Sequence, residues 1–290
     1  TVTNPALAAT LGAVASNGAN AFYKGANAKA IAVRVAAETP RKRGMTERDL
    51  GSYRAMPRAA VCGIYRAYRV CGMGPPSSGA TTVLATLKQL ERFNLGTLGP
   101  KSPTAWHLMA ESMRLAYADR ELYLGDPDFV SVPIRGLTDP NYLAARSKLI
   151  SANATMPKAH PGTPPGVTVA FADGTEPPES GTSHFVVIDR DGTAISYTST
   201  IEGSFGSGIM VGGYYLNNEL TDFSFTPKAE QRPVANRVEG GKRPRSSMSP
   251  TVIYGPDGKL FMVIGAAAGA TIPAQVTRGI VCAIDWKMDA

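Results

Sequence analysis

The clearest periodic pattern along the chain precedes a turn sequence at residues 125–128. Large side chains recur there at spacings of three and four residues, at Trp106, Met109, Met113 and Tyr117. Such spacing places side chains on one face of a helix, and the sequence Gly-Asp-Pro-Asp at 125–128 is typical of a turn that ends one. We therefore predict an amphipathic helix that ends at this turn.

The first part of the chain gives further helix and strand signals. Residues 1–18 are mildly apolar and lack a basic leader, so we interpret them as a helix inside a domain and not as a signal peptide. Thr46 and Asp49 have the spacing of a capping box, which predicts a helix start. Residues 59–73 alternate and predict a pair of strands, and the segment 74–80 then leads into another helix.

Two β-hairpins are predicted in the last part of the chain. One turns at Asp191-Gly192 and the other at Asp257-Gly258, and Asp-Gly is a dipeptide favoured in tight hairpin turns. The strand at 185–188 is apolar at every position, which predicts that both of its faces are buried.

Residues 152–181 separate the helical part from the β-rich part. Proline is frequent there and large apolar side chains are few, which is typical of a linker or mobile loop. Helices with a small sheet, then a linker, then paired hairpins predict a layered α/β or α+β domain.

Composition agrees with a globular protein and argues against several classes. Of the 290 residues, 43% are hydrophobic and 18% are charged, which is sufficient for a core, and no apolar run has the length of a membrane span. The net charge is +7, but the basic clusters at 40–44 and 241–245 are short and not interleaved with aromatic residues. Nucleic-acid binding is therefore disfavoured.

The cysteines do not predict a metal site. The sequence contains no CxxC and no Cys/His pair at metal-ligand spacing, and we predict neither a metal nor an organic cofactor. The spacing of Cys62 and Cys71 permits a disulfide across a hairpin, although two buried thiols are the favoured interpretation. Cysteine usage, including Cys282, leaves the cellular compartment open.

Thr182 is the strongest candidate for chemistry, although a lone threonine that opens a strand is usually only a polar residue. Gly181 and the proline-rich loop before it offer the exposure and backbone freedom that a chain-cleavage site needs. Cleavage between Gly181 and Thr182 would give Thr182 a free α-amino group, whose ordinary pKa is about 7.7–8. That amine could act as the base for the threonine hydroxyl, whereas the amide nitrogen of the intact chain cannot.

The glycine-rich stretch at 203–208 and the residues near it contain candidate binding groups. The spacing of the glycines does not match a nucleotide-binding loop, but glycines allow backbone to approach a ligand closely. The acidic residues of the region are Glu202, Glu219 and Asp222. If they converge, their repulsion calls for a cation such as the ammonium group of a substrate; surface carboxylates are the simpler interpretation.

Two later loops contain further candidates. Ser246 and Ser247 follow Arg245, and paired hydroxyls can donate hydrogen bonds to a carboxylate. The small-residue loop at 265–273 could expose backbone N–H groups as an oxyanion hole. A polar loop and a plain tight turn are the simpler alternatives.

Taken in order, these stretches resemble the γ-glutamyltranspeptidase family of N-terminal-nucleophile hydrolases. The resemblance covers almost the whole chain and rests on FYKG, PPSSG, AYADRELYLGDPDFV, TSHFVVIDRDGTAISYT, SFGSGI, LNNELTDFS, KRPRSSMSPT and GAAAG. It implies an α+β fold, a four-layer αββα sandwich. It also implies a precursor that cleaves itself before a threonine, which then forms a γ-glutamyl ester.

The resemblance also implies roles for individual residues. Thr182 would be the nucleophile and new N-terminus, and Thr200 would hydrogen-bond it and assist its activation. The backbone N–H groups of Ala268 and Gly269 would form the oxyanion hole. The residues implied for donor binding are Glu202, Glu219 and Asp222 for the α-amino group, and Ser246 and Ser247 for the α-carboxylate.

The same resemblance divides the chain at the cleavage bond. Residues 1–181 would be the C-terminal part of a large-subunit region that ends in the loop 152–181, and 182–290 the start of a small-subunit region. Together they would form one αββα domain that is incomplete at both ends. The family's N-terminal portion, which carries an Arg that binds the donor carboxylate, is not in this sequence. Family members are usually periplasmic or extracellular, and no signal for either location is visible here.

Three departures from the family pattern stand out. Glu202 occupies a position where the family usually has Asn. Ala268-Gly269 replaces the usual Gly-Gly, and an alanine is tolerated there only if its φ is negative. The segment 223–241 corresponds to the family's lid region and contains no Tyr.

The resemblance therefore implies a γ-glutamyl transferase and hydrolase that acts on glutathione-like donors, with water, an amino acid or a peptide as acceptor. A cephalosporin or glutaryl acylase of the same fold is the nearest alternative, but Glu219 and Asp222 would then face an acyl group that has no ammonium. The other alternative is an unprocessed, inactive homologue or fragment.

Overall fold

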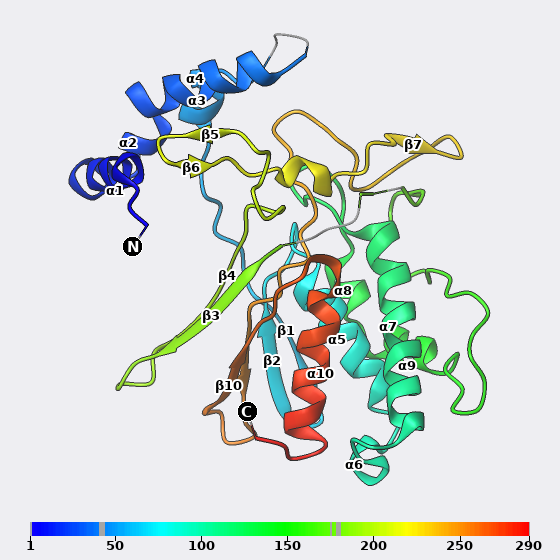
Figure 1. Cartoon of the computed structure of the whole chain (residues 1–290). Coiled ribbons are helices and arrows are strands. Elements are labelled where there is room, and N and C mark those ends of the chain that lie inside the picture. The colour runs from blue at the N-terminus through cyan, green and yellow to red at the C-terminus, as the bar shows by residue number, and fades with distance from the viewer. Residues whose placement is uncertain (1, 41–43, 175, 178–180, 290) are drawn as a thin grey trace. The chain divides into compact units, whose positions relative to one another are not determined.

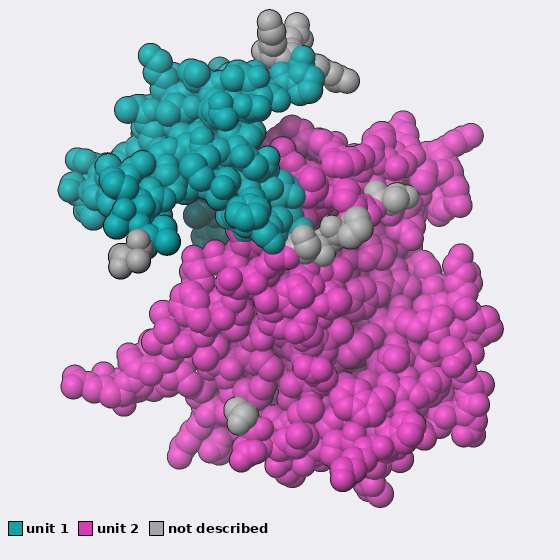
Figure 2. Space-filling view, viewed as in Figure 1, with its two compact units in different colours: residues 1–57, 201–219 teal, residues 58–200, 220–290 magenta. Residues whose placement is uncertain are grey.

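A computed structural model of the chain describes residues 2–40, 44–174, 176–177 and 181–289 (Figure 1). The basic cluster at 40–44 therefore lies mostly outside the described residues. The chain forms two compact units, unit 1 from residues 1–57 and 201–219, and unit 2 from residues 58–200 and 220–290 (Figure 2). Among the described helices, none has the length and apolar character needed to cross a membrane.

Unit 1 is mainly helical. Its helices are α1 (Pro5–Asn17), α2 (Asn20–Tyr23), α3 (Gly25–Glu38) and α4 (Glu47–Ser52), and its short strands are β5 (Met210–Val211) and β6 (Tyr214–Tyr215). The helix predicted at the start of the chain is confirmed as α1, and the capping box of Thr46 and Asp49 starts α4. Asn4 caps α1 and donates from Nδ2 to the Gly213 carbonyl at 2.7 Å, which ties together the two segments of the unit.

An antiparallel sheet with the order β1-β2-β9-β10 lies at the centre of unit 2. Its strands are β1 (Val61–Tyr65), β2 (Tyr68–Gly72), β9 (Thr251–Tyr254) and β10 (Leu260–Ile264). The predicted strand pair at 59–73 and the hairpin around Asp257-Gly258 are both confirmed. Because β2 pairs with β9, the sheet joins the early and late parts of the chain.

Helices complete the core of unit 2, and the first of them packs against β1 and β2. They are α5 (Gly79–Leu90), α6 (Leu95–Leu98), α7 (Pro103–Tyr123), α8 (Ile134–Leu137), α9 (Pro140–Ser147) and α10 (Ile272–Ile284). Leu87 of α5 and Met109 of α7 share one buried cluster with Ile253 of β9. The predicted amphipathic helix is confirmed as α7, although Trp106 lies at the edge of its apolar face and is 41% exposed. Helices packed together with an antiparallel sheet confirm the α+β class.

The hairpin of β3 (Ser183–Ile188) and β4 (Ala194–Ser199) is confirmed around its predicted turn, but it corrects the prediction of burial. The side chains at 185–188 are 45–54% exposed. The two strands pair with each other as a separate ribbon, and the described residues do not cover both of its faces. An apolar run predicts a strand from local propensity, but its burial depends on a covering layer.

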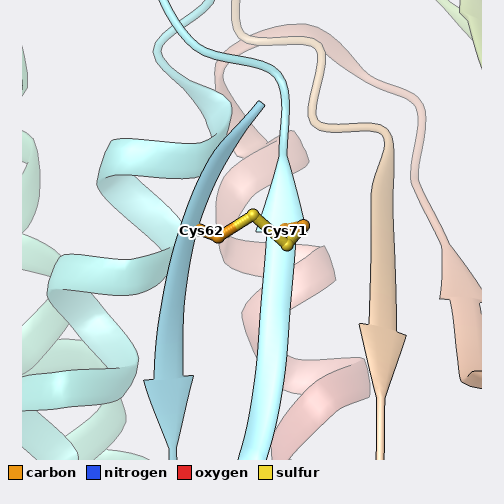
Figure 3. Close-up of a disulfide and its surroundings, with 2 residues drawn as sticks. All are labelled: Cys62 and Cys71. Atoms are coloured by element: carbon orange, nitrogen blue, oxygen red, sulfur yellow. A yellow bond between two sulfur atoms is a disulfide. The ribbon is translucent and has the colours of Figure 1, made fainter. Parts of the chain in front are cut away.

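Cys62 and Cys71 form a disulfide between β1 and β2 (Figure 3). The two residues are direct partners in the strand register, with Cα atoms 4.1 Å apart. The interpretation of two buried thiols is therefore wrong, because the hairpin register places the two side chains opposite each other. Among the described residues, Cys282 is the free cysteine.

The proline-rich segment 152–181 has no helix or named strand in its described part, but it is not a free linker. The N–H of Gly162 donates to Asp119 of α7 at 2.7 Å, and Phe171 and Ala172 are buried. The predicted loop is confirmed in the described part, and as far as residue 174 these contacts hold it against unit 2. Residues 175 and 178–180 lie outside the described part.

Candidate active site

The register of the β3–β4 hairpin places Thr182 opposite Thr200. Ser183 pairs with Ser199 at the open end of the hairpin, so the next residue outward on each strand lies across from the other. Thr200 Oγ1 donates to the carbonyl oxygen of Gly181 at 2.9 Å, and the hydroxyl of Thr182 donates to the same oxygen. Two hydroxyl groups therefore meet at the carbonyl of the predicted cleavage bond.

This arrangement favours attack on the Gly181 carbonyl. A donated hydrogen bond polarises the carbonyl and strengthens as negative charge develops on its oxygen. Gly181 has a φ of 65°, a left-handed conformation that glycine adopts without a steric penalty. The bond is intact in this structure, and the division of the chain at this point stays a prediction.

His184 is a site residue to which the sequence analysis gave no role. It lies on the same strand face as Thr182, and its Nδ1 is 2.8 Å from Thr198 Oγ1. Among the described residues, its buried Nε2 has no hydrogen-bond partner. Burial lowers the pKa of the imidazole, which favours the neutral ring. A Cβ built on Gly265 would lie 2.2 Å from this ring, so glycine permits the close approach of the loop after β10 to β3.

The segment that contains Ser246 is fixed against the start of α5. The N–H of Ser246 donates to the Pro76 carbonyl at 3.0 Å, and the Ser246 carbonyl accepts from the N–H of Ser78 at 2.7 Å. A Cβ on Gly79 would lie 2.5 Å from Ser249 Oγ, so glycine permits this close packing. The N-terminus of a helix carries partial positive charge, which suits the carboxylate that Ser246 and its neighbour are expected to bind.

Ser247 is held by a buried arginine. Arg120 of α7 is 2% exposed and donates from Nη2 to Ser247 Oγ at 2.6 Å. The accepting hydroxyl keeps its own proton for another acceptor, such as a substrate carboxylate. Arg120 also pairs with Glu121, as does Arg245. Burial alone would raise the pKa of Glu121, but the charges of the two arginines outweigh it, so the net shift of this pKa is downward.

The acidic residues are divided between the two units. Glu202 and Glu219 belong to unit 1, and each has a carboxylate oxygen within 4.8 Å of the other's. Such a pair can hold a metal ion or an ammonium group, because a cation relieves its repulsion. Glu202 has a φ of 68°, a region that Asn tolerates better than Glu. Asp222 belongs to unit 2 and ends the short 3₁₀-helix η1 (Glu219–Asp222).

The loop after β10 contains two successive residues with a positive φ. Ala268 has a φ of 91° and Gly269 a φ of 56°, and the 3₁₀-helix η2 (Gly269–Thr271) then leads into α10. Among the described residues, no acceptor is present for the N–H groups of Ala268 and Gly269, which are the first donors of this helical segment. The condition of a negative φ for Ala268 is not met, so its side chain strains the backbone.

Sequence reasoning missed Arg120, although a signal was present. The spacing that joins Met113 to Tyr117 on α7 continues to Arg120, so a charged residue lies on the apolar side of an amphipathic helix. A buried charge needs a partner. The charge partner, Glu121, is the next residue in the chain, but the contact with Ser247 joins residues 127 positions apart, where no local pattern can reveal it.

Comparison with known proteins shows the family of the chain. The family model described as gamma-glutamyltranspeptidase matches residues 1–290. A glutathione hydrolase proenzyme of Bacillus subtilis (strain 168) is 40% identical over 98% of this chain and 48% of its own length. Another, of Escherichia coli (strain K12), is 38% identical over the same shares of the two chains.

Solved structures share the fold. A crystal structure of cephalosporin acylase from Bacillus halodurans matches 99% of this chain and 48% of that chain, with a TM-score of 0.83 and 24% identity. At that identity the likeness shows the fold alone. The chain spans about half the length of the curated relatives it matches. On the match of the family model over its whole length, the chain belongs to the gamma-glutamyltranspeptidase family.

Proposed function

We propose that this chain is the self-cleaving and catalytic part of a γ-glutamyl transferase and hydrolase for glutathione-like donors. The observation that carries the proposal is the meeting of the Thr182 and Thr200 hydroxyls at the Gly181 carbonyl. Its relatives named glutathione hydrolase proenzyme support both the substrate class and the self-cleavage.

Self-cleavage would proceed through an ester. Thr182 Oγ1 attacks the Gly181 carbonyl carbon, the C–N bond breaks, and the hydroxyl proton is transferred to the departing nitrogen. Water then hydrolyses the ester, which leaves a carboxylate on Gly181 and a free α-amine on Thr182. Thr200 would stabilise the oxyanion through the hydrogen bond that it already makes.

Turnover would use the newly freed amine. With an ordinary pKa near 8, the Thr182 amine takes the hydroxyl proton as the oxygen attacks the γ-carbonyl of the donor and passes it to the leaving amine. Ala268 and Gly269 would donate their N–H groups to the oxyanion. Water, an amino acid or a peptide then resolves the γ-glutamyl ester.

Donor selection would rest on two charges. Glu202, Glu219 and Asp222 would bind the α-ammonium, and Ser246 and Ser247 the α-carboxylate. An acylase activity is the second candidate, because a relative named Acylase ACY 1 proenzyme, of Pseudomonas sp. (strain SE83), is 32% identical over 97% of this chain. The acidic residues disfavour it, since a glutaryl group has no ammonium to meet them.

Two measurements test the proposal on the full-length protein. Wild type should give two fragments on a denaturing gel, the second beginning Thr-Ser-His, and Thr182→Ala should give one band and no turnover. The processed enzyme should hydrolyse a γ-glutamyl anilide faster than a matched glutaryl anilide. A persistent single band for wild type, or a preference for the glutaryl compound, would contradict the proposal.

The disulfide supports a location outside the reducing cytosol. Structural disulfides form and persist in oxidising compartments, and Cys62–Cys71 closes a hairpin of the central sheet. We propose a periplasmic or extracellular location on this basis, and detection of the oxidised pair in protein isolated under thiol-blocking conditions tests it.

A further inference from the structure

Glu176 lies shortly before the cleavage bond and is anchored in the interior of unit 2. Its Oε1 accepts from Asn236 Nδ2 at 2.6 Å, and its Oε2 accepts from Arg245 Nη2. The side chains of Arg245 and Glu176 are 0% and 14% exposed, and Asn236 is fully buried. A carboxylate in such surroundings is fixed in position, because both of its oxygens are held by buried donors.

The two partners are themselves fixed. Asn236 Oδ1 accepts from the backbone N–H of Arg245 at 2.9 Å, and its Nδ2 also donates to the Asp222 carbonyl at 2.7 Å. Arg245 Nη1 donates to the Arg120 carbonyl at 2.9 Å. Glu176 is therefore attached to a rigid part of the unit and not to a surface side chain.

The chain is thus held at Glu176 and again at Gly181. Glu176 anchors the start of this segment, and the hydrogen bond from Thr200 holds the Gly181 carbonyl at the end of the segment. Fixing both ends of a short segment restricts the positions that its last carbonyl can occupy. An attack by Thr182 on that carbonyl depends on such restriction, since misplacement by about 1 Å can cost on the order of a hundredfold in rate.

A purely structural role for Glu176 is less consistent with these contacts. Arg245 keeps a second carboxylate partner, Glu121, when Glu176 is removed. The buried guanidinium is then still paired, so the penalty for an isolated buried charge does not arise. The contact between Arg120 and Ser247 does not involve Glu176 either.

We propose that Glu176 is a positioning residue for self-cleavage, which holds the segment before Gly181 so that its carbonyl meets the attacking hydroxyl. The inference rests on the proposed function, because it assigns a step within that reaction. After cleavage Glu176 belongs to a chain end that no longer carries a scissile bond. Its removal should therefore slow processing and leave the processed enzyme nearly unchanged.

The test compares full-length wild type, Glu176→Ala and Glu176→Gln, synthesised without cells so that cleavage is followed from the start. Glu230→Ala is the matched control, because it removes a carboxylate that is exposed and paired only near the surface with Arg232. We expect Glu176→Ala to cleave about ten- to a hundredfold more slowly. Acetate should not restore its rate, because a free carboxylate can pair with Arg245 but is not attached to the chain at residue 176.

Glu176→Gln keeps the shape of the side chain but faces Arg245 with an amide that has lost the charge, so its rate should lie between those of wild type and Glu176→Ala. This variant decides the matter if the alanine variant unfolds. Once processed, each variant should have a KM and a kcat within about threefold of the wild-type values. Wild-type cleavage rates in both Glu176 variants would overturn the inference and leave the proposed function intact. Failure of the wild type itself to cleave would contradict both the inference and the proposed function.

Discussion

Replacement of Thr200 by valine would test the hydroxyl pair at the cleavage bond. Valine keeps the β-branched shape of threonine and removes only the hydroxyl, which donates to the Gly181 carbonyl at 2.9 Å. Thr200 lies directly after β4, so its position is set by the hairpin and not by the hydrogen bond. The change therefore removes one donor and leaves the register intact.

The magnitude follows from how the charge on that oxygen changes. In the intact peptide the carbonyl is neutral, and such a hydrogen bond contributes about 1 kcal/mol. In the tetrahedral intermediate the oxygen is negative, and loss of one oxyanion donor costs about 2.7–4 kcal/mol, or roughly 10²–10³ in rate. The difference between the two states predicts that Thr200→Val slows self-cleavage by about a hundredfold.

The assay is the rate at which the two fragments appear after synthesis of the full-length protein without cells, at fixed pH and temperature. Thr200→Ser keeps the donor and should remain within about tenfold of wild type. The thermal midpoint of each uncleaved protein reports whether the fold is maintained. Cleavage of Thr200→Val at the wild-type rate, with an unchanged midpoint, would refute the role that we assign to this hydrogen bond.

Three further predictions concern stability, measured by denaturant unfolding of full-length protein with Thr182→Ala as background to keep one chain. Ala268→Gly should stabilise by about 1 kcal/mol, because it relieves a left-handed alanine, which costs about 1–2 kcal/mol, at a smaller cost in chain entropy. Replacement of Cys62 and Cys71 by serine should destabilise by about 2.5 kcal/mol, since the bridge closes a loop with a sequence separation of 9. Burial lowers the pKa of Lys242 from 10.5 to about 8, so Lys242→Met should gain more stability relative to wild type at pH 7.5 than at pH 10.

The sign of the Lys242 effect is fixed by linkage. Below pH 8 the amine is charged in both states, and the folded protein bears the full cost of its burial. As the pH rises from about 8 towards 10.5, the folded state releases its proton first and the cost shrinks. The hydrogen bond to the Ala235 carbonyl is lost in the variant at both pH values and cancels. An advantage of the variant that grows with pH would contradict this reasoning.

The stability predictions have equally direct counter-results. A destabilised Ala268→Gly would mean that the backbone of this loop is not strained by its alanine. An unfolding free energy unchanged on loss of both Cys62 and Cys71 would mean that the bridge does not restrict the unfolded chain.

Local patterns predicted the elements of the chain but not their environment. The hairpins followed from Asp-Gly turns and α7 from its spacing, because both depend on neighbours within a few residues. The exposure of residues 185–188 could not be predicted, since burial depends on what else packs against a strand. Sequence spacing does not decide between a disulfide and two thiols at Cys62 and Cys71, because the outcome depends on their register in the hairpin.

Local patterns likewise predicted only part of the candidate site. Thr182 was identified from its loop and from a family resemblance, and the pairing of strand ends then places Thr200 at the same carbonyl. Glu176 could not be identified from its surroundings in the sequence. Its partner Arg245 lies 69 residues further along the chain, and only the fold brings the two together.

The β3–β4 hairpin also limits how many residues the turn at its far end can contain. The turn is closed by the Asp189 carboxylate, which accepts from the N–H groups of Asp191 and Thr193 at 2.9 and 2.8 Å. Each strand is 6 residues long, so this turn lies about 20 Å from the cleavage bond. A single inserted residue that shifted the pairing would turn alternate side chains to the opposite face and separate Thr182 from Thr200. The number of residues in a remote surface turn would therefore determine whether the proposed self-cleavage can occur.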